Sequence, residues 1–358
     1  MLSVGIVGLP NVGKSTVFNA LSHGGAKVSN YAFCTIEPNR AVVSVPDPRL
    51  ERMAAIFDQA RAVPAAIEFI DIAGLVRGAS RGEGLGNQFL AAIREVDAIL
   101  HVVRAFPDPQ IPHVEGSVDP ARDAEIVELE LILADLASVE RRRERLRPAL
   151  KARSAEAEQE AAALDLLAAH LNSQRPARVL PDRDRILPAL QLYLLTGKPE
   201  VYLLNAGEAP GEAQALVAQL QARLDGPVVA LPAKLEADLG ELEEAERAQF
   251  TAEMGVSTSG LEQVIHACYQ ALDLVTFYTG VGAEARAWAV PRGTELEVAA
   301  GRIHSDMERG FIRAEVVDFA SLDQAGSWAE AHRAGRVRTE GRDYAVQDGD
   351  VILVRFHV

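Results

Sequence analysis

The segment that most constrains this chain is residues 8–15, Gly-Leu-Pro-Asn-Val-Gly-Lys-Ser, which matches the pattern G-x-x-x-x-G-K-S/T. It follows the apolar run 2–7, which predicts a buried strand, and precedes residues 16–21, which have helical spacing. Glycines let the backbone wrap a phosphate so that successive N–H groups point inward. The next helix turns its positive N-terminal end to the same anion. The segment therefore predicts a strand–loop–helix unit that binds a nucleoside triphosphate.

Each residue of this loop has an expected task. Lys14 supplies a point charge to the β- and γ-phosphates and is a catalytic candidate, while the Ser15 hydroxyl is a ligand for Mg²⁺. The loop residues expected to contact the nucleotide are Asn11, Val12, Gly13, Lys14, Ser15 and Thr16.

A second motif, Asp71-Ile72-Ala73-Gly74, ends the predicted strand 66–72. Asp71 in this position can hold Mg²⁺ through water, and the Gly74 N–H can reach the γ-phosphate, which makes Gly74 a catalytic candidate. Thr35 lies in residues 31–39, a stretch with little helix or strand pattern. We expect Thr35 to be a switch ligand of Mg²⁺, the alternative being an ordinary loop threonine.

Two positions depart from the pattern of guanine-nucleotide switches. Leu75 stands where many G proteins carry a water-orienting glutamine, so intrinsic turnover should be slow. The guanine-reading motif Asn-Lys-x-Asp is replaced by residues 205–208, Asn-Ala-Gly-Glu, after the predicted strand 200–205. Asn205 can pair with the amino and N7 edge of adenine, and the Glu208 carboxylate sits one methylene further out than aspartate. ATP is therefore expected to be preferred and GTP tolerated; the alternative is a turn unrelated to the base.

The order of apolar runs predicts three parts. Strands alternating with helices predict a mostly parallel sheet covered on both faces, formed by residues 1–120 and 198–276. Residues 121–197 contain two long helical stretches, 124–151 and 155–171, which predict an inserted antiparallel hairpin. Residues 277–358 predict a small α+β domain with short strands at 286–290, 295–298, 314–317 and 351–356. The fold class is thus α/β, of the P-loop NTPase (G-domain-like) type.

Composition excludes several classes of protein. The net charge of −15 argues against broad binding to nucleic acid and against a DNA-binding role. No apolar run reaches the roughly 18 residues that span a bilayer, so no membrane association is expected. The N-terminal run lacks the features of a signal peptide, and the two cysteines are far apart. We expect a cytoplasmic monomer.

With these motifs placed, the chain resembles the YchF-type Obg-like ATPases, a branch of the translation-factor-related GTPases. The resemblance covers nearly the whole length. It rests on residues 8–15, 33–39, 71–76 and 78–87, and on Arg286-Ala287-Trp288, 299–306 and 310–316. These last segments look like the TGS domain, a ubiquitin-like β-grasp. The resemblance implies an ATPase that tolerates GTP, associates with ribosomes and carries a coiled-coil insertion.

The resemblance also implies two further site residues. His113 matches a histidine that is a catalytic candidate where the glutamine is missing; a solvent-exposed loop histidine is the alternative. Asn11 resembles a residue that helps to bind K⁺ beside the phosphates, and a hydrogen bond within the loop is its alternative.

A cluster of basic residues gives the predicted hairpin a local positive field. It consists of Arg141, Arg142, Arg143, Arg145, Arg147, Lys151 and Arg153. Such a surface can follow ribosomal RNA phosphates, and a solvated helix face is the alternative. Three functions remain open: an ATP-hydrolysing switch on the ribosome, a GTPase of the same class, and a nucleotide-gated scaffold with negligible turnover.

Overall fold

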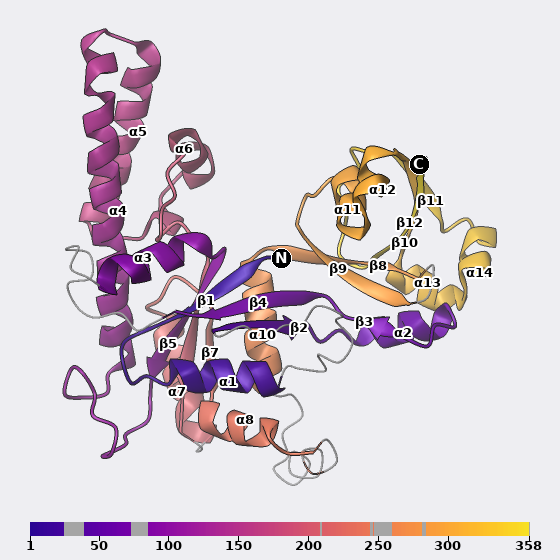
Figure 1. Ribbon diagram of the computed structural model, residues 1–358, viewed down its shortest axis with the longest axis horizontal. Helices are drawn as coiled ribbons and strands as arrows, with labels where there is room; N and C mark the ends of the chain where they lie inside the picture. The colour runs from indigo at the N-terminus through magenta and orange to yellow at the C-terminus, as the bar shows by residue number, and fades with distance from the viewer. Residues whose placement is uncertain are drawn as a thin grey trace.

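The computed structural model describes residues 1–24, 39–72, 85–207, 210–243, 246, 260–280 and 284–357 (Figure 1). In this part of the chain the strands form two sheets of six strands each. The predicted mostly parallel sheet, helical insertion and C-terminal β-rich part are all confirmed.

The first sheet has the strand order β2-β4-β1-β5-β6-β7. Its strands are β1 (Ser3–Val7), β2 (Arg40–Ser44), β4 (Ala66–Asp71), β5 (Ala98–Arg104), β6 (Glu200–Asn205) and β7 (Val228–Leu231). Only β2, at one edge, runs antiparallel to its neighbour among these strands. Every residue of β1, β5 and β6 is buried, as expected for central strands covered on both faces.

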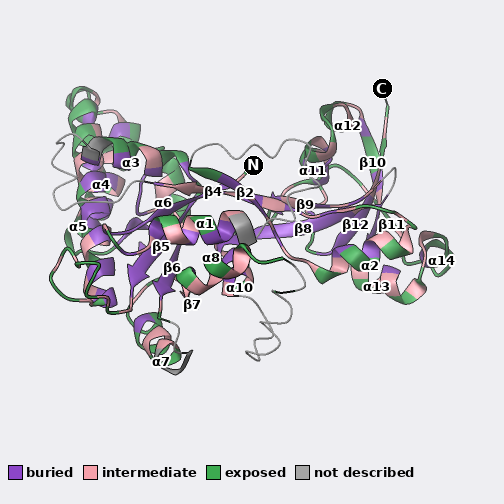
Figure 2. Ribbon diagram, turned by 60° about the horizontal axis from the view of Figure 1, so that its bottom comes forward, coloured by how far each residue is buried: buried purple, intermediate pink, exposed green. Residues whose placement is uncertain are grey.

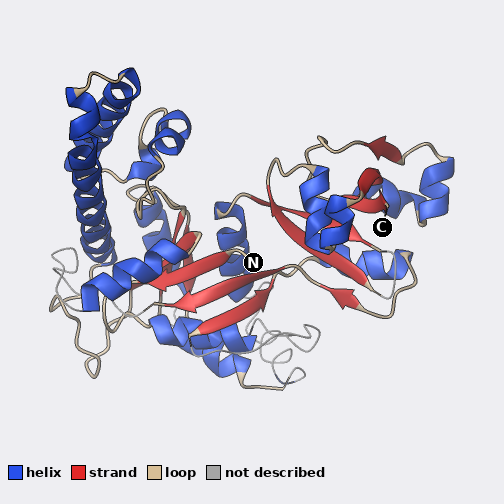
Figure 3. Cartoon of the chain, turned by 45° about the horizontal axis from the view of Figure 1, so that its top comes forward, coloured by secondary structure: helices blue, strands red, loops and turns tan. Residues whose placement is uncertain are grey.

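Helices lie on both sides of this sheet (Figure 3). They are α1 (Lys14–Gly24), α3 (Leu85–Glu95), α7 (Pro210–Gln221), α8 (Ala233–Gly240) and α10 (Gly260–Ala271). The strongly amphipathic α10 buries Leu261, Val264, Ile265 and Cys268, at the three- and four-residue spacing of one helix face. The apolar core is therefore continuous from the sheet into its covering helices.

The insertion is a hairpin of α4 (Pro120–Lys151) and α5 (Ala155–Asn172), which projects from the sheet (Figure 1). Asp119 caps α4 by accepting the N–H of Arg122, and Ser154 caps α5 by accepting that of Ala157. Val139 and Leu146 of α4 are buried together with Leu164 and Leu167 of α5 in a separate core. The chain returns to β6 through η3 (Ala177–Val179) and α6 (Arg183–Leu190), two short helices that the sequence pattern did not indicate.

A buried ionic cluster joins the insertion to the sheet. Arg178 contacts Glu200 Oε2 at 2.9 Å, binds Glu128 of α4, and donates to the Tyr202 hydroxyl at 2.9 Å. His101 Nδ1 lies 2.7 Å from the other Glu200 oxygen. Although burial opposes it, the positive charge of Arg178 lowers the pKa of Glu200. The foot of the hairpin is thus held by charge pairs shielded from water.

The second sheet has the order β11-β10-β12-β8-β9-β3. Its strands are β3 (Ala62–Val63), β8 (Leu274–Thr279), β9 (Ala285–Pro291), β10 (Phe311–Asp318), β11 (Arg338–Glu340) and β12 (Asp350–Phe356). The helices α11 (Leu296–Ile303), α12 (Ser305–Arg309), α13 (Phe319–Ala325) and α14 (Trp328–Arg333) accompany it. The burial colouring of Figure 2 shows buried residues along the strands of both sheets.

One predicted strand was wrong. Residues 295–298 alternate polar and apolar residues, which favoured a strand, but they enter helix α11. Leu296, Ala299 and Ala300 are the buried residues of this helix, and their spacing of three and four is helical. The alternation covered too few residues to decide between the two periods.

The link between β2 and β4 crosses to the second sheet. Within it, α2 (Pro48–Ile56) places Arg49 Nη1 2.7 Å from Asp348 and Arg52 Nε 2.5 Å from Asp323. Strand β3 then pairs in parallel with β9. Figure 1 shows α2 beside α13, away from the first sheet. A segment of the N-terminal region is therefore part of the C-terminal packing, which the sequence did not indicate.

A search of the described residues found no helix with both the length and the apolar content required to pass through a membrane.

Candidate nucleotide-binding site

The loop between β1 and α1 has the backbone of a phosphate cradle. Gly8 and Gly13 have φ values of 150° and 96°. A Cβ on Gly8 would lie 2.3 Å from the carbonyl oxygen of Val102, and one on Gly13 would lie 2.2 Å from Asn205 Nδ2. Any larger residue would displace neighbouring backbone or side chain at these points. The two glycines therefore allow the loop to pack tightly against the ends of β5 and β6.

Lys14 is held inside this loop. Its Nζ donates to the carbonyl of Leu9 at 2.8 Å and to that of Gly8 at 3.1 Å. Burial lowers the pKa of Lys14 to about 8, against the opposing effect of Asp71. The ammonium group is thus positioned by the cradle and is more easily deprotonated than a surface lysine.

Ser15 and Asp71 lie together although they are far apart in sequence. The Ser15 hydroxyl donates to Asp71 Oδ2 at 3.1 Å. Burial raises the pKa of Asp71, while the Ser15 hydrogen bond and the charge of Lys14 lower it. A hydroxyl and a carboxylate are hard oxygen donors that fit Mg²⁺, which keeps several waters and takes few protein ligands. The other two predicted phosphate-side residues, Thr35 and Gly74, lie outside the described residues.

Asn205 connects the cradle to the start of α8. Its Nδ2 donates to the carbonyl of Val12 at 2.9 Å, and its Oδ1 accepts the N–H of Ala233 at 3.3 Å. The side chain is buried, with both ends of the amide engaged by backbone. Pairing with adenine would require one of these bonds to open, and that role stays a prediction. Glu208 lies outside the described residues.

The loop between β5 and α4 approaches the cradle. Asn11 Nδ2 donates to the carbonyl of Pro112 at 3.2 Å. This bond reaches a different loop and is not the internal bond considered as the alternative to K⁺ binding. The next residue, His113, has a side chain only 4% exposed, with Nε2 2.8 Å from Asp123 Oδ2. The alternative of a solvent-exposed loop histidine is therefore wrong for this conformation.

The sequence did not indicate two residues of this region, Arg104 and Asp123. Arg104, the last residue of β5, is 1% exposed and donates to the carbonyl groups of Phe106 and Ile111, each at 2.9 Å. Its guanidinium also lies 4.6 Å from the centre of the Phe106 ring. An arginine at the end of a strand that is apolar apart from His101 was the available signal. Asp123, also 1% exposed, gave no signal beyond its place in the first turn of a helix.

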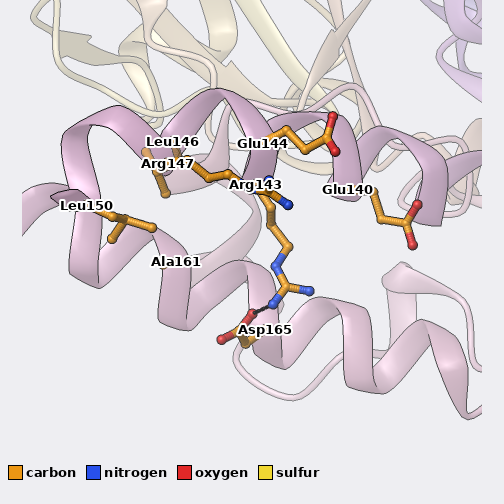
Figure 4. Close-up of a pocket in the computed structure, with 8 residues that line it drawn as sticks. All are labelled: Glu140, Arg143, Glu144, Leu146, Arg147, Leu150, Ala161 and Asp165. Atoms are coloured by element: carbon orange, nitrogen blue, oxygen red, sulfur yellow. Dashed lines mark ion pairs between the residues drawn. The ribbon is translucent and has the colours of Figure 1, made fainter.

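The basic surface of the hairpin is partly neutralised (Figure 4). Arg142 pairs with Glu160 at 2.5 Å, and Arg143 pairs with Asp165 at 2.7 Å across to α5. Figure 4 shows Arg143 reaching Asp165 beside a pocket that Leu146, Leu150 and Ala161 also line. Within this basic cluster, the exposed residues for which we find no ion pair in the described ranges are Arg141, Arg145, Arg147, Lys151 and Arg153.

Comparison with known proteins identifies related families and chains. Residues 3–138 match the family described as "50S ribosome-binding GTPase". Residues 274–357 match the family YchF-GTPase_C, described as "Protein of unknown function (DUF933)".

Full-length relatives are similar throughout. The "Ribosome-binding ATPase YchF" of Bacillus subtilis (strain 168) is 47% identical over 366 residues, covering 100% of both chains. The protein of the same name from Escherichia coli O157:H7 is 45% identical over 358 residues, covering 99% of both. The solved structure of the Schizosaccharomyces pombe YchF GTPase has a TM-score of 0.85 and 34% identity, covering 99% of this chain and 97% of its own. The chain therefore belongs to the YchF family of P-loop nucleotide-binding proteins.

Proposed function

We propose that this chain is a Mg²⁺-dependent ATPase that prefers ATP over GTP, acts as a conformational switch and binds the ribosome. The observation that carries the proposal is the placement of Ser15 and Asp71 beside Lys14. The Lys14 ammonium and the oxygen atoms of Ser15 and Asp71 lie at the phosphate-binding loop, toward which the strand–loop–helix unit directs its N–H groups. The curated relatives, named ribosome-binding ATPases, support the same reaction and partner.

Each site residue has a proposed role in nucleotide binding or hydrolysis. The cradle N–H groups and Lys14 hold the phosphates, and Ser15 and Asp71 would hold Mg²⁺, which supplies positive charge to the phosphate oxygens when bound. His113 is the proposed group that positions the attacking water, since Leu75 has no hydrogen-bonding atom. Thr35 is proposed as a further ligand of Mg²⁺, and the Gly74 N–H is proposed to contact the γ-phosphate. Asn205 and Glu208 are proposed to contact the base. Asn11 is proposed to help bind K⁺.

The chain is proposed to work in three parts: residues 1–120 with 198–276 as the nucleotide-binding domain, 121–197 as the coiled-coil insertion, and 277–358 as the TGS domain. The strand β8, which begins at Leu274, suggests moving the last boundary by a few residues. We propose a cytoplasmic monomer that presents the hairpin and the TGS domain to ribosomal RNA or protein.

Calorimetry of ATP and GTP on one preparation, in the presence of Mg²⁺, tests nucleotide preference. We expect ATP to bind more tightly than GTP; the reverse order would favour a GTPase. Single-turnover phosphate release with Mg²⁺ and K⁺, with and without ribosomes, then tests hydrolysis. Binding without release under any of these conditions would leave a nucleotide-gated scaffold and refute the ATPase.

A further inference from the structure

The loop that carries His113 is anchored on three sides. Arg104 fixes its start through the carbonyl groups of Phe106 and Ile111. Asn11 of the cradle binds its middle at Pro112. Asp123, in the first turn of α4, binds its end at His113. His113 therefore directly follows Pro112, the residue that contacts the phosphate-binding loop. Its imidazole also contacts the carboxylate of Asp123 in the helical insertion.

The hydrogen bond to Nδ1 defines the imidazole tautomer. The Glu115 N–H donates to His113 Nδ1 at 3.1 Å, so Nδ1 carries a lone pair and no hydrogen. The hydrogen of the neutral ring is then on Nε2, which lies 2.8 Å from Asp123 Oδ2 in a close polar contact that a small rotation of the ring would align as a hydrogen bond. Arg122 binds the other oxygen of the same carboxylate, with Nη2 at 2.8 Å. Arg122 thus fixes the orientation of the Asp123 carboxylate, whose other oxygen lies beside His113.

We propose that Asp123 is a positioning residue for His113, which fixes the Nε2–H tautomer and leaves Nδ1 as the nitrogen that accepts a proton from the attacking water. The inference rests on the proposed ATPase function. It goes beyond that function because it gives the first turn of the helical insertion a part in hydrolysis. A carboxylate that orients an imidazole and stabilises its protonated form is an established way to strengthen a histidine base.

The proposed step balances as follows. The Glu115 N–H releases Nδ1, and the water oxygen forms a bond to the γ-phosphorus. The bond from that phosphorus to the β–γ bridging oxygen breaks, and its electron pair stays on the diphosphate. The water proton passes to Nδ1, while Nε2 keeps its own hydrogen, so the imidazolium that forms lies beside the Asp123 carboxylate.

Asp123 also connects the site to the insertion mechanically. It belongs to α4, the same 32-residue helix that carries the basic surface near its other end. A shift of α4 would move the carboxylate relative to His113, because the pair spans the loop and the helix. A ligand on the hairpin could in this way change turnover without touching the nucleotide.

Asp123→Asn in the full-length chain, combined with His113→Ala, tests the inference. We expect Asp123→Asn to lower kcat at least about tenfold, a part of the roughly 100- to 10,000-fold that a positioned acid–base group contributes. The affinity for ATP should stay within about twofold, because neither residue contacts the cradle through its side chain. In the His113→Ala background the same substitution should have no further effect on kcat, since the two residues act as one unit.

A matched control is available on the same helix. Asp135 is equally buried and accepts the N–H groups of Leu195 and Thr196, far from the loop. Asp135→Asn should reduce stability and leave kcat unchanged. If Asp135→Asn lowers kcat as much as Asp123→Asn, or if Asp123→Asn remains harmful in the His113→Ala background, the positioning role is refuted.

Ring ¹⁵N chemical shifts give a readout that does not need turnover. The wild-type chain should show His113 as the Nε2–H tautomer, and Asp123→Asn should shift the ring signals toward a mixture. Identical shifts in both chains would refute the inference alone. A wild-type chain that binds ATP and never releases phosphate, with or without ribosomes, would instead refute the proposed function.

Discussion

The Ser15 hydroxyl donates a hydrogen bond of 3.1 Å to Asp71 Oδ2 and so joins the start of α1 to the end of β4. The two residues meet because β1 and β4 are parallel neighbours, with Ile6 opposite Asp71 in the register. Parallel strands end at the same edge of a sheet, where ligands of α/β proteins bind. Ser15 and Asp71, which lie 56 positions apart in the sequence, therefore meet at one corner of the sheet, where we propose that Mg²⁺ binds.

Asp71→Asn should raise the Mg²⁺ concentration needed for ATP binding about tenfold, or about 1.4 kcal/mol. The amide keeps the shape of the side chain and can still accept from Ser15, but it loses the charge that attracts the metal. Calorimetry of ATP at a series of Mg²⁺ concentrations measures the shift. Glu68→Gln, on the same strand and partly exposed, is the control and should change nothing. An unchanged Mg²⁺ requirement in Asp71→Asn would remove Asp71 from the metal site.

ATP affinity should fall as pH rises above 8. Burial lowers the pKa of Lys14 to about 8, so the ammonium loses its proton above that value in the nucleotide-free protein. The negative charge of bound phosphates raises the pKa of Lys14. Between the pKa of the nucleotide-free protein and that of the complex, ATP binding is therefore accompanied by uptake of a proton. Affinity at pH 8 should be about half of its value at neutral pH, and it should fall by up to about tenfold per pH unit above 8.

Calorimetry in two buffers of different ionisation enthalpy would detect this proton uptake directly. Lys198→Met is the matched control, because burial also lowers the pKa of Lys198, which lies away from the cradle and binds the carbonyl groups of Arg94 and Val96. This variant should keep the wild-type pH profile. An affinity independent of pH up to 9.5 in the wild-type chain would contradict the prediction.

Arg178→Met should lower the free energy of unfolding by roughly 3–5 kcal/mol, since it leaves the buried carboxylate of Glu200 and the partly buried one of Glu128 without their cation. Urea unfolding measures the loss. Arg223→Met is the control: Arg223 pairs with Glu125, also on α4, at 2.8 Å, but both side chains are more than half exposed. That pair should contribute less than about 1 kcal/mol. Equal losses in the two variants would show that burial does not strengthen the Arg178 cluster.

Ribosome co-sedimentation should depend on the unpaired basic residues of the hairpin. Changing Arg145, Arg147 and Lys151 to Gln should reduce the slope of log affinity against log salt by about three, one for each lost phosphate contact. Arg142→Gln with Arg143→Gln should reduce it less, because Glu160 and Asp165 already neutralise these arginines. If the triple substitution leaves the salt dependence of ribosome binding unchanged, these residues form only a solvated helix face and do not contact the ribosome.

Features carried by neighbouring residues were predictable from the sequence. The cradle, the sheet strands and the long helices each follow from a local pattern, and the structure confirms the strands and helices within a few residues, apart from residues 295–298. Contacts between distant segments were not predictable. The bond from Asn205 to Val12 and the contact of Asp123 with His113 depend on how the strands and the insertion pack, for which the local sequence offers no signal.

The two residues of β3 have a consequence for any shortened form of the chain. Ala62 and Val63 lie between β2 and β4 in sequence, yet they hydrogen-bond along β9 at the edge of the other sheet. A chain cut before Leu274 would therefore leave this short strand without its partner and expose the ring of Phe57, which packs 6.2 Å from that of Trp328. Loss of the C-terminal region would therefore also affect β4, the strand that ends in Asp71, because β3 directly precedes β4 in the chain.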